Sequence, residues 1–323
     1  MKFLDLVTAT AIYLHRKIKF GIIIFILYFV SYHIYPNSYT GGFILIRIVT
    51  DSSCDFDLEQ AAQMNVDVVP LHIYFGETEY LDRQTLSVAD FYEKLETVDK
   101  LPSTAQVNPH QFIEVFQPYV EAGDEIVGIF LSSELSGTYQ SALMARNQLN
   151  GSHIHIVDSR NAALGHHLLI QIAVQLRDQG LSAAEIAEQI TALSKRVRLT
   201  ACVKTMKYLV MGGRVSPALG KIGGVLGITP LIEVTGGKVE SAGKVRGHKA
   251  ANRWIHQYIE QHPLDNQYPA VFTQSVNPEG RDELIAALSD VLSGCSIMNC
   301  DLGCTIGTHI GPGAIGIAYI EKE

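Results

Sequence analysis

Short apolar runs alternate with longer amphipathic segments along most of this chain, from about Arg47 onward. Runs rich in Ile, Val and Phe, such as residues 125–131 and 270–274, are typical of buried strands. Longer segments, such as residues 164–179 followed by Gly180, are typical of helices that end at a glycine. Strands and helices that alternate in this way predict an α/β fold.

The order of these elements predicts two α/β domains. In residues 47–198 the predicted strands are separated by helices, which favours a mainly parallel sheet. In residues 199–323 the short predicted strands 231–234 and 239–241 flank Gly236-Gly237, a pair typical of a β-hairpin turn. We therefore expect a mixed sheet in the second domain.

Capping residues mark where several helices begin. Ser87 with Asp90, Asn108-Pro109, and Ser182 with Glu185 each have the spacing of a helix N-terminus. Residues 66–74 are expected to form one strand with a bend or an edge position at Pro70. The final stretch, residues 296–320, is expected to form two strands around a glycine-rich loop, 307–313, that contains His309.

Residues 1–46 form an apolar N-terminal extension that differs from the rest. Residues 20–35 are almost wholly apolar and follow Arg16, Lys17 and Lys19. As a helix this run would span about 24 Å, which is short of the roughly 30 Å hydrocarbon core of a bilayer. A signal anchor, a secretory signal peptide and a dispensable extension remain open. We favour the dispensable extension, with membrane association through residues 16–35 as the alternative.

Composition excludes some classes of function. The 323 residues carry a formal net charge of −8, which argues against nucleic acid as the main partner. Five cysteines, an odd number in a long chain, favour a reducing compartment such as the cytoplasm. Their spacing lacks the CxxC pattern and paired histidines of a zinc site, so no metal is expected, and no cofactor motif is present.

The loop after the predicted strand 125–131 is the strongest candidate for a binding site. It supplies several hydroxyls and a glycine, namely Ser132, Ser133, Ser136, Thr138 and Gly137. A helix N-terminus suits an anion, Ser136 could cap it, and Gly137 would let a ligand approach the backbone. No lysine follows, so a carboxylate fits better than a polyphosphate. From these residues alone, an ordinary serine-capped helix is the favoured interpretation.

Other motifs are weaker. Residues 311–316 match GxGxxG, but a strand rather than a helix is predicted after them, so they do not indicate a dinucleotide site. No GxSxG nucleophile motif is present, although Ser136, His309 and Asp51 could form a hydrolase triad if the fold brought them together. The glycine-rich apolar segment 217–227 fits either close helix packing or the wall of an apolar cavity.

Several motifs in a fixed order resemble the DegV family, bacterial proteins that bind one long-chain fatty acid. The resemblance runs from about Arg47 to Ala318. It rests on Ile48-Val49-Thr50-Asp51-Ser52, Val69-Pro70-Leu71, Ser103-Thr104-Ala105-Gln106, residues 132–142, Gly212-Gly213-Arg214-Val215-Ser216, Lys244-Val245-Arg246-Gly247 and Gly307-Thr308-His309-Ile310-Gly311-Pro312-Gly313-Ala314. Members usually begin near the first strand, so the N-terminal extension departs from the family pattern, as does Ala105 where serine is common.

The resemblance implies a fatty acid buried near the junction of the two domains. Its carboxylate would be held by Thr104 and Ser136, with His309 close by. Some members present the carboxylate to a separate ATP-using kinase subunit that forms an acyl phosphate, so this chain would be a carrier rather than an enzyme. Arg214 and Arg246 would then contact phosphate or the partner, although surface salt bridges would also explain them.

Overall fold

The computed structural model describes residues 44–218 and 227–323. Ile44–Glu323 form one compact unit, separate from residues 1–43. The predictions for the apolar segment 20–35, and most of those for 217–227, lie outside the described residues. No helix in the described ranges is long and apolar enough to cross a membrane.

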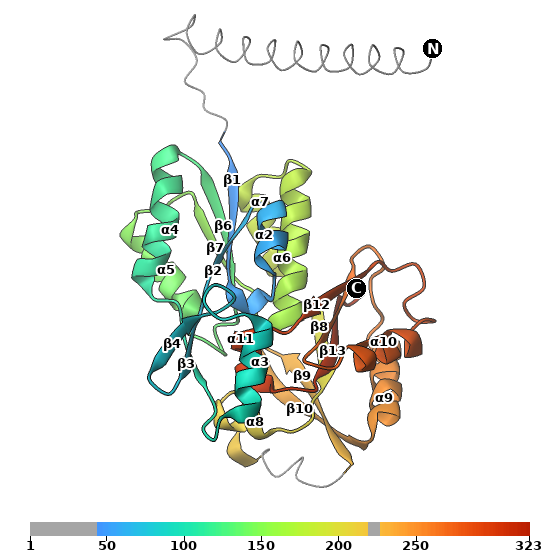
Figure 1. Ribbon diagram of the computed structural model, residues 1–323. Coiled ribbons are helices and arrows are strands. Elements are labelled where there is room, and N and C mark those ends of the chain that lie inside the picture. The colour runs from blue at the N-terminus through green and yellow to red at the C-terminus, as the bar shows by residue number, and fades with distance from the viewer. Residues whose placement is uncertain (1–43, 219–226) are drawn as a thin grey trace, which may run out of the picture. The chain divides into compact units, whose positions relative to one another are not determined.

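A four-stranded parallel sheet forms the first half of the unit, as predicted. Its strand order is β2-β1-β6-β7, and Figure 1 shows helices on both of its faces. The strands are β1 (Ile46–Asp51), β2 (Val66–Val69), β6 (Glu125–Phe130) and β7 (Ile154–Asp158). The helices are α4 (Pro109–Ala122) and α5 (Thr138–Gln148) on one face, and α2 (Leu58–Gln63), α6 (Ala163–Asp178) and α7 (Ala183–Leu193) on the other.

A six-stranded mixed sheet forms the second half, again as predicted. Its order is β10-β9-β8-β13-β11-β12, and β11 and β12 are its parallel neighbours. The strands are β8 (Val197–Cys202), β9 (Ile228–Thr235), β10 (Lys238–Arg246), β11 (Ala270–Gln274), β12 (Ile297–Asp301) and β13 (Ile315–Ile320), with α9 (His248–Gln261) and α10 (Pro278–Ala287) packed beside them. The hairpin predicted at Gly236-Gly237 joins β9 to β10.

Helix α6 packs against both sheets and joins the two halves. Every residue from Ala163 to Val174 is buried, which is typical of a helix with neighbours on all sides. One continuous apolar cluster includes Ile48 of the parallel sheet, Leu168 of α6 and Val271 of the mixed sheet. The two sheets therefore share a core, and a boundary at 198/199 within it stays a prediction.

A three-stranded antiparallel sheet was not predicted. It consists of β3 (His72–Phe75), β4 (Thr78–Leu81) and β5 (Ser103–Ala105) in the order β4-β3-β5. The prediction of one strand over residues 66–74 was wrong, because the chain leaves the parallel sheet at Pro70 and enters this small sheet. Between β4 and β5, helix α3 (Val88–Thr97) begins at Ser87, whose hydroxyl accepts the Asp90 N–H as predicted.

The end of the chain differs most from the prediction. Residues 304–310 form helix α11 (Cys304–Ile310), so His309 lies in the last turn of a helix and not in a loop. Glycine at position 307 lowers helix propensity, but the buried carboxylate of Asp82 accepts the backbone N–H groups of Cys304 and Thr305. A distant side chain therefore stabilises the start of this helix.

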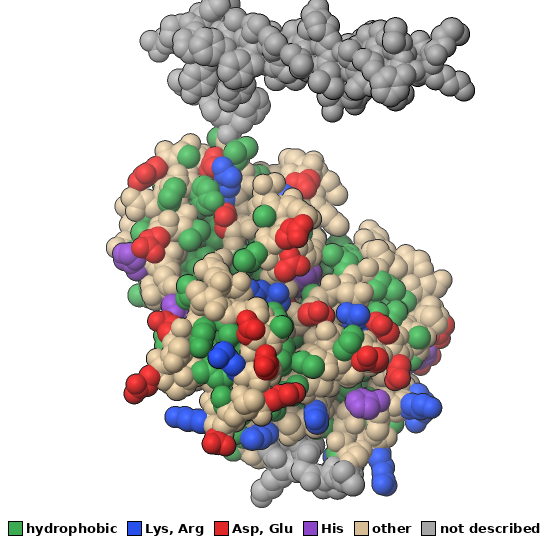
Figure 2. All heavy atoms as spheres, viewed as in Figure 1, with side chains coloured by type: hydrophobic (Ala, Val, Ile, Leu, Met, Phe, Trp, Pro, Cys, Tyr) green, Lys and Arg blue, Asp and Glu red, His purple; other side chains and the backbone are tan. Residues whose placement is uncertain are grey.

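The surface carries charges of both signs. On the face shown in Figure 2, acidic and basic side chains are interspersed. That face offers no continuous basic stripe of the kind that tracks a nucleic acid backbone.

Candidate functional site

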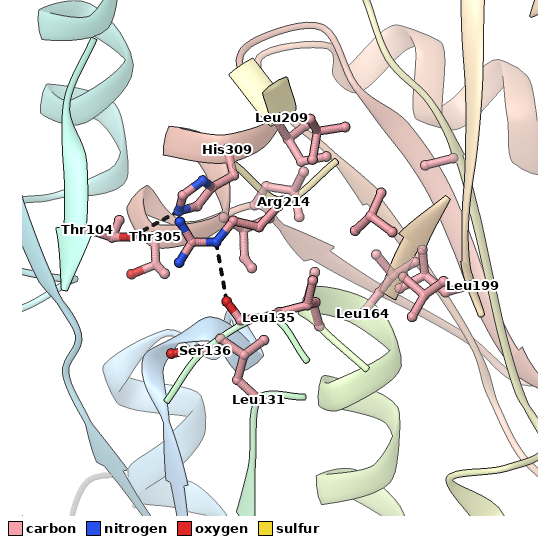
Figure 3. A pocket seen from close by; sticks show the side chains of 18 of the residues that line it. Thr104, Leu131, Leu135, Ser136, Leu164, Leu199, Leu209, Arg214, Thr305 and His309 are labelled. Carbon is pink, nitrogen blue, oxygen red and sulfur yellow. Dashed lines mark hydrogen bonds between the residues drawn. The ribbon is translucent and has the colours of Figure 1, made fainter. Parts of the chain in front are cut away.

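An apolar cavity lies between the parallel sheet, the mixed sheet and helix α11. All the space between its lining residues, including the part open to solvent, is about 850 Å³, but the centre of a water-sized sphere fits in only about 90 Å³ of it. Most of the lining is aliphatic and includes Leu131, Leu164, Leu199, Ile232, Val234 and Ile306. In Figure 3 the polar side chains gather on one side of the cavity, and Leu164 and Leu199 lie on the other.

The loop that follows β6 forms part of the polar end. Strands β1 and β6 are the central neighbours of the parallel sheet, and the chain proceeds from them toward opposite edges. Ligands of open α/β sheets bind at this kind of switch point, beside the carboxyl ends of the strands. Asp51, at the end of β1, accepts the N–H of Leu131 at 2.8 Å and thereby fixes the start of the loop.

Ser136 lies in this loop and lines the cavity. Its Oγ lies 3.0 Å from Oγ1 of Thr138 and accepts the Thr138 N–H at 3.3 Å. The predicted cap was one residue too early, because Gly137 is the N-cap of α5. A Cβ at Gly137 would lie 2.0 Å from Oε1 of Gln106, so the glycine here makes room for a side chain of the protein.

Thr104 and His309 form the second part of the polar end. Thr104 on β5 and His309 on α11 are joined by a hydrogen bond of 2.9 Å between Oγ1 and Nε2. Burial, together with the positive charge of Arg214, lowers the pKa of His309 to about 4. The imidazole is therefore neutral at pH 7, with one ring nitrogen as donor and the other as acceptor.

Gly212 explains how His309 is held. The Nδ1 atom of His309 is buried and has no hydrogen-bond partner in the described residues. A Cβ at Gly212 would lie 2.2 Å from this atom, so only glycine lets the ring pack against that turn. The Gly212-Gly213-Arg214 sequence thus positions a histidine almost a hundred residues further along the chain.

Arg214 completes the polar end, as Figure 3 shows. Its Nε donates to the carbonyl of Leu135 at 3.2 Å, and its Nη1 donates to the carbonyl of Gly212 at 2.6 Å. The side chain is partly buried, and burial lowers the pKa of its guanidinium. Within the described ranges no carboxylate lies at ion-pair distance from it. A partly desolvated cation without a counter-charge favours an anionic ligand.

The structure brings together most of the predicted site residues. Thr104, Ser136, Arg214 and His309 all line the cavity. Gly137 adjoins it, whereas Arg246 lies exposed at the end of β10, outside the lining.

Three polar residues of the lining were missed, namely Gln106, Thr273 and Thr305. Gln106 belongs to the 103–106 motif, and its Nε2 donates to Ser141. Thr305 lies just before the 307–314 motif, and both its N–H and its hydroxyl donate to Asp82. Position in or beside a motif was the available signal for Gln106 and Thr305. Thr273 lies within β11, where its hydroxyl donates to the Cys300 carbonyl, and no motif marked it.

The hydrogen bonds of Ser136 and Asp51 bear on the hydrolase hypothesis. Ser136 bonds to Thr138 and not to His309, and Asp51 bonds to Ser53 and Leu131. The hydrolase triad considered from the sequence is therefore not assembled. In residues 44–218 and 227–323, no group of His, Cys, Asp and Glu side chains is placed to hold a metal ion.

Comparisons with known proteins agree on one family. The profile described as "Uncharacterised protein, DegV family" matches residues 45–322. DegV domain-containing proteins of Clostridium perfringens and Caldanaerobacter subterraneus are 32% and 34% identical, and each alignment covers 86% of this chain and 99% of the relative.

Solved structures extend the similarity to the fold. A fatty-acid-binding DegV family protein from Thermus thermophilus has a TM-score of 0.76 at 27% identity, covering 86% of this chain and 100% of that one. A stearic-acid-binding protein from Eubacterium ventriosum has a TM-score of 0.78 at 26% identity, covering 86% and 99%.

Proposed function

The chain belongs to the DegV family, and from this premise we propose that it binds one long-chain fatty acid in the cavity between its sheets. The observation that carries the proposal is the division of that cavity into two ends. One end is aliphatic, and the other holds two hydroxyls, a neutral histidine and an arginine that has no counter-charge among the residues that the structure describes. A long chain with a single terminal anion matches this division.

In this proposal the carboxylate lies among Thr104, Ser136 and Arg214. Both hydroxyls can donate to a carboxylate oxygen, and the guanidinium offers several N–H donors and a positive charge. His309 orients the Thr104 hydroxyl through its Nε2. Gly137 acts indirectly, because it leaves room for Gln106 beside the loop.

The energies of the two ends differ. At about 0.8 kcal/mol per buried CH₂, a sixteen-carbon chain contributes roughly 12 kcal/mol before the costs of ordering it. One hydrogen bond to a charged group contributes about 1.5–3 kcal/mol. The aliphatic end therefore supplies most of the affinity, and the polar end fixes the position of the carboxylate.

We further propose that the protein is a carrier that presents this carboxylate to a separate ATP-dependent kinase in the cytoplasm. Arg214 lies where a phosphate would form, beside the proposed carboxylate position. Arg246 is exposed and lies outside the cavity, so its role in this proposal is contact with the partner or with ATP phosphates. Free thiols at all five cysteines suit a reducing compartment.

Native mass spectrometry of gently purified protein tests lipid binding. The expected result is one added mass that corresponds to a fatty acid, removed by delipidation and restored by palmitate. A protein that stays empty after incubation with C14 to C18 acids contradicts the proposal.

Hydroxylamine trapping of acyl phosphate, with the cognate kinase and ATP, tests the carrier role. Arg246→Ala is expected to hold fatty acid normally but to form little acyl phosphate. Arg214→Ala, which removes a proposed carboxylate contact, is expected to weaken fatty-acid binding as well as acyl phosphate formation. Equal loss of lipid and product in Arg246→Ala contradicts a partner role for that residue.

A serine hydrolase acting on acyl substrates is the alternative enzyme class, and no contact in the described site favours it. Turnover of a chromogenic acyl ester that Ser136→Ala abolishes would establish it. A membrane-anchored lipid sensor depends on residues 16–35, outside the described ranges. It stays a prediction, as does transient membrane contact.

A further inference from the structure

The tip of the β9–β10 hairpin contacts the loop that carries Ser136. The hydroxyl of Ser132 donates to the carbonyl of Gly237 at 2.7 Å. Nη2 of Arg160 donates to the carbonyl of Gly236 at 2.6 Å. Lys238 and Glu134 form an ion pair of 3.2 Å whose side chains are both largely exposed, so it contributes little. The two backbone carbonyls of the turn are thus its main polar points of attachment, beside the apolar packing of Val234 in the core.

These contacts hold the free end of a two-stranded ribbon. Strand β9 pairs with β8 over only three positions, with Thr200 opposite Glu233 as the last. Beyond it the ribbon continues to the pair Thr235 and Lys238. An isolated two-stranded ribbon is marginally stable in water, so the position of this end depends on the packing of Val234 and Val239 against the core and on what the tip contacts. Val234 and Val239 on this free end line the cavity.

Ser132 links the hairpin tip to the proposed carboxylate site. It is fully buried, and its backbone carbonyl accepts the N–H groups of Leu135 at 3.0 Å and Ser136 at 3.1 Å. Its hydroxyl also accepts the N–H of Glu134 at 3.3 Å while it donates to Gly237. The conformation of the loop 132–136 and the position of the tip are therefore set by the same residue.

We propose that Ser132 and the Gly236-Gly237 turn form a clasp that positions Ser136 and controls exchange of the bound acyl chain. The inference rests on the proposed fatty-acid binding. It adds a residue that positions Ser136 and a route by which the acyl chain leaves the cavity. When the clasp opens, the free end of the ribbon lifts and the wall formed by Val234 and Val239 separates from the loop. The acyl chain then leaves on that side, and Ser136 loses its fixed position at the same time.

The two glycines of the turn provide matched variants. Both have left-handed backbone conformations, with φ of 61° at Gly236 and 89° at Gly237. A Cβ at Gly236 would come no closer than 3.9 Å to a neighbouring atom, Nη2 of Arg160, whereas a Cβ at Gly237 would lie 2.7 Å from Oγ of Ser132. Alanine at either position strains the turn, but only alanine at 237 displaces the Ser132 hydroxyl.

A second matched pair lies in the loop itself. Ser132 and Ser133 are adjacent, and each donates a short hydrogen bond through its hydroxyl. Ser132 donates to the hairpin tip, whereas Ser133 donates to Oδ2 of Asp158 at 2.6 Å within the first half. Ser133→Ala therefore removes an equivalent bond without touching the clasp.

Displacement of a fluorescent fatty acid from the full-length protein, followed by stopped flow, tests the proposal. Ser132→Ala and Gly237→Ala are expected to raise the dissociation rate roughly 3- to 10-fold, as loss of one buried hydrogen bond predicts. Gly236→Ala and Ser133→Ala should stay within about twofold of the parent. The double variant Ser132→Ala/Gly237→Ala should be no faster than the faster single variant, because both act on one contact.

A second readout separates positioning from general loosening. If Ser132 positions Ser136, then Ser132→Ala should reduce the preference for palmitate over methyl palmitate, and Ser133→Ala should keep it. Thermal unfolding of the delipidated variants identifies any that fail to fold. A parent protein that binds no fatty acid overturns the proposed function and the clasp together. If the parent protein binds fatty acid and all four single variants release it at the same rate, the clasp alone is overturned.

Discussion

The two ends of the cavity are built in different ways. The aliphatic end is carried by regular elements, with Leu199 on β8, Ile232 on β9 and Leu164 on α6. The polar end is assembled from a loop, a three-residue strand, a turn and the last turn of a short helix, which carry Ser136, Thr104, Arg214 and His309.

This difference shows how affinity and position are divided. An aliphatic wall depends on volume and shape, and apolar residues of similar size can replace one another in it at modest cost. The polar end depends on supporting contacts such as Gly212 against His309 and the Leu135 carbonyl on Arg214. We expect changes in the aliphatic end to alter which chains bind, and changes in the polar end to alter how the carboxylate is held.

The largest effect is expected from shortening the aliphatic end. Leu199 lies far from Thr104 in Figure 3, so Leu199→Trp should fill space that only a long chain needs. Exclusion of about four methylenes costs roughly 3 kcal/mol, or about a 100-fold loss of affinity for a C18 acid. A C10 acid, measured by calorimetry on the same variant, should bind as it does to the parent. Equal losses of affinity for the C18 and the C10 acid would show that Leu199 does not lie along the bound acyl chain.

A smaller effect is expected at the polar end. The variants Thr104→Val, Ser136→Ala and His309→Ala should each weaken the binding of palmitate by about 1.5–3 kcal/mol, since each removes or misplaces a hydrogen bond to a charged group. Methyl palmitate lacks the charge, so its affinity should fall less than that of palmitate in the same titrations. If the variants leave the ratio of the palmitate affinity to the methyl palmitate affinity unchanged, the carboxylate binds elsewhere.

A pH titration tests the burial of His309. Its pKa is about 4 in the folded protein and near 6.5 when unfolded, so it is neutral in both states above pH 6.5. As pH falls from 6.5 to 4, the unfolded chain takes up a proton that the folded site resists, and the free energy of unfolding decreases. Urea unfolding of delipidated protein should show a smaller decrease in His309→Ala than in the parent.

His256 serves as the control for that titration. It is bonded to Asp290, which raises its pKa, so its protonated form is favoured in the folded state. His256→Ala should therefore not reduce the loss of stability at low pH. A parent and a His309→Ala variant with the same pH dependence would contradict the neutral, buried imidazole.

The smallest effect is expected from removal of residues 1–43. The first strand begins at Ile46, and none of the predicted contacts of either end of the cavity requires the deleted residues. The truncated chain should remain folded and should bind palmitate within about twofold of the full-length affinity. Aggregation of the truncated chain, with full-length protein recovered only from membranes, would contradict this expectation.

Local signals in the sequence were sufficient for much of the fold. The helix N-caps at Asn108 and Ser182 and the hairpin at Gly236-Gly237 are confirmed, because each depends on residues within a few positions of one another. The resemblance to a family placed Thr104, Ser136 and His309 in one site. They line a single cavity in the structure, although their roles toward a ligand stay predictions.

What was missed depends on distant partners. Helix α11 begins where the carboxylate of Asp82 accepts hydrogen bonds from the first N–H groups of the helix. Asp82 precedes the helix by more than two hundred positions. The small sheet of β3, β4 and β5 forms because Pro70 ends one strand and Ile73 pairs with Thr104. The reason for glycine at 137 was also misassigned, because Gln106 fills the space beside it. No local pattern indicates such partners.

The contacts that complete the polar end have a consequence for the order of folding. Thr104 and His309 are 205 positions apart, and the bonds from Asp82 to Thr305 and from Asp55 to Gly303 span 223 and 248 positions. Contacts between such distant segments slow folding, because long loops must close before they form. A chain emerging from the ribosome cannot complete this site until residues 303–309 have been made. Until then the aliphatic side chains that face the cavity lack their final cover, and during that interval the chain is most exposed to aggregation.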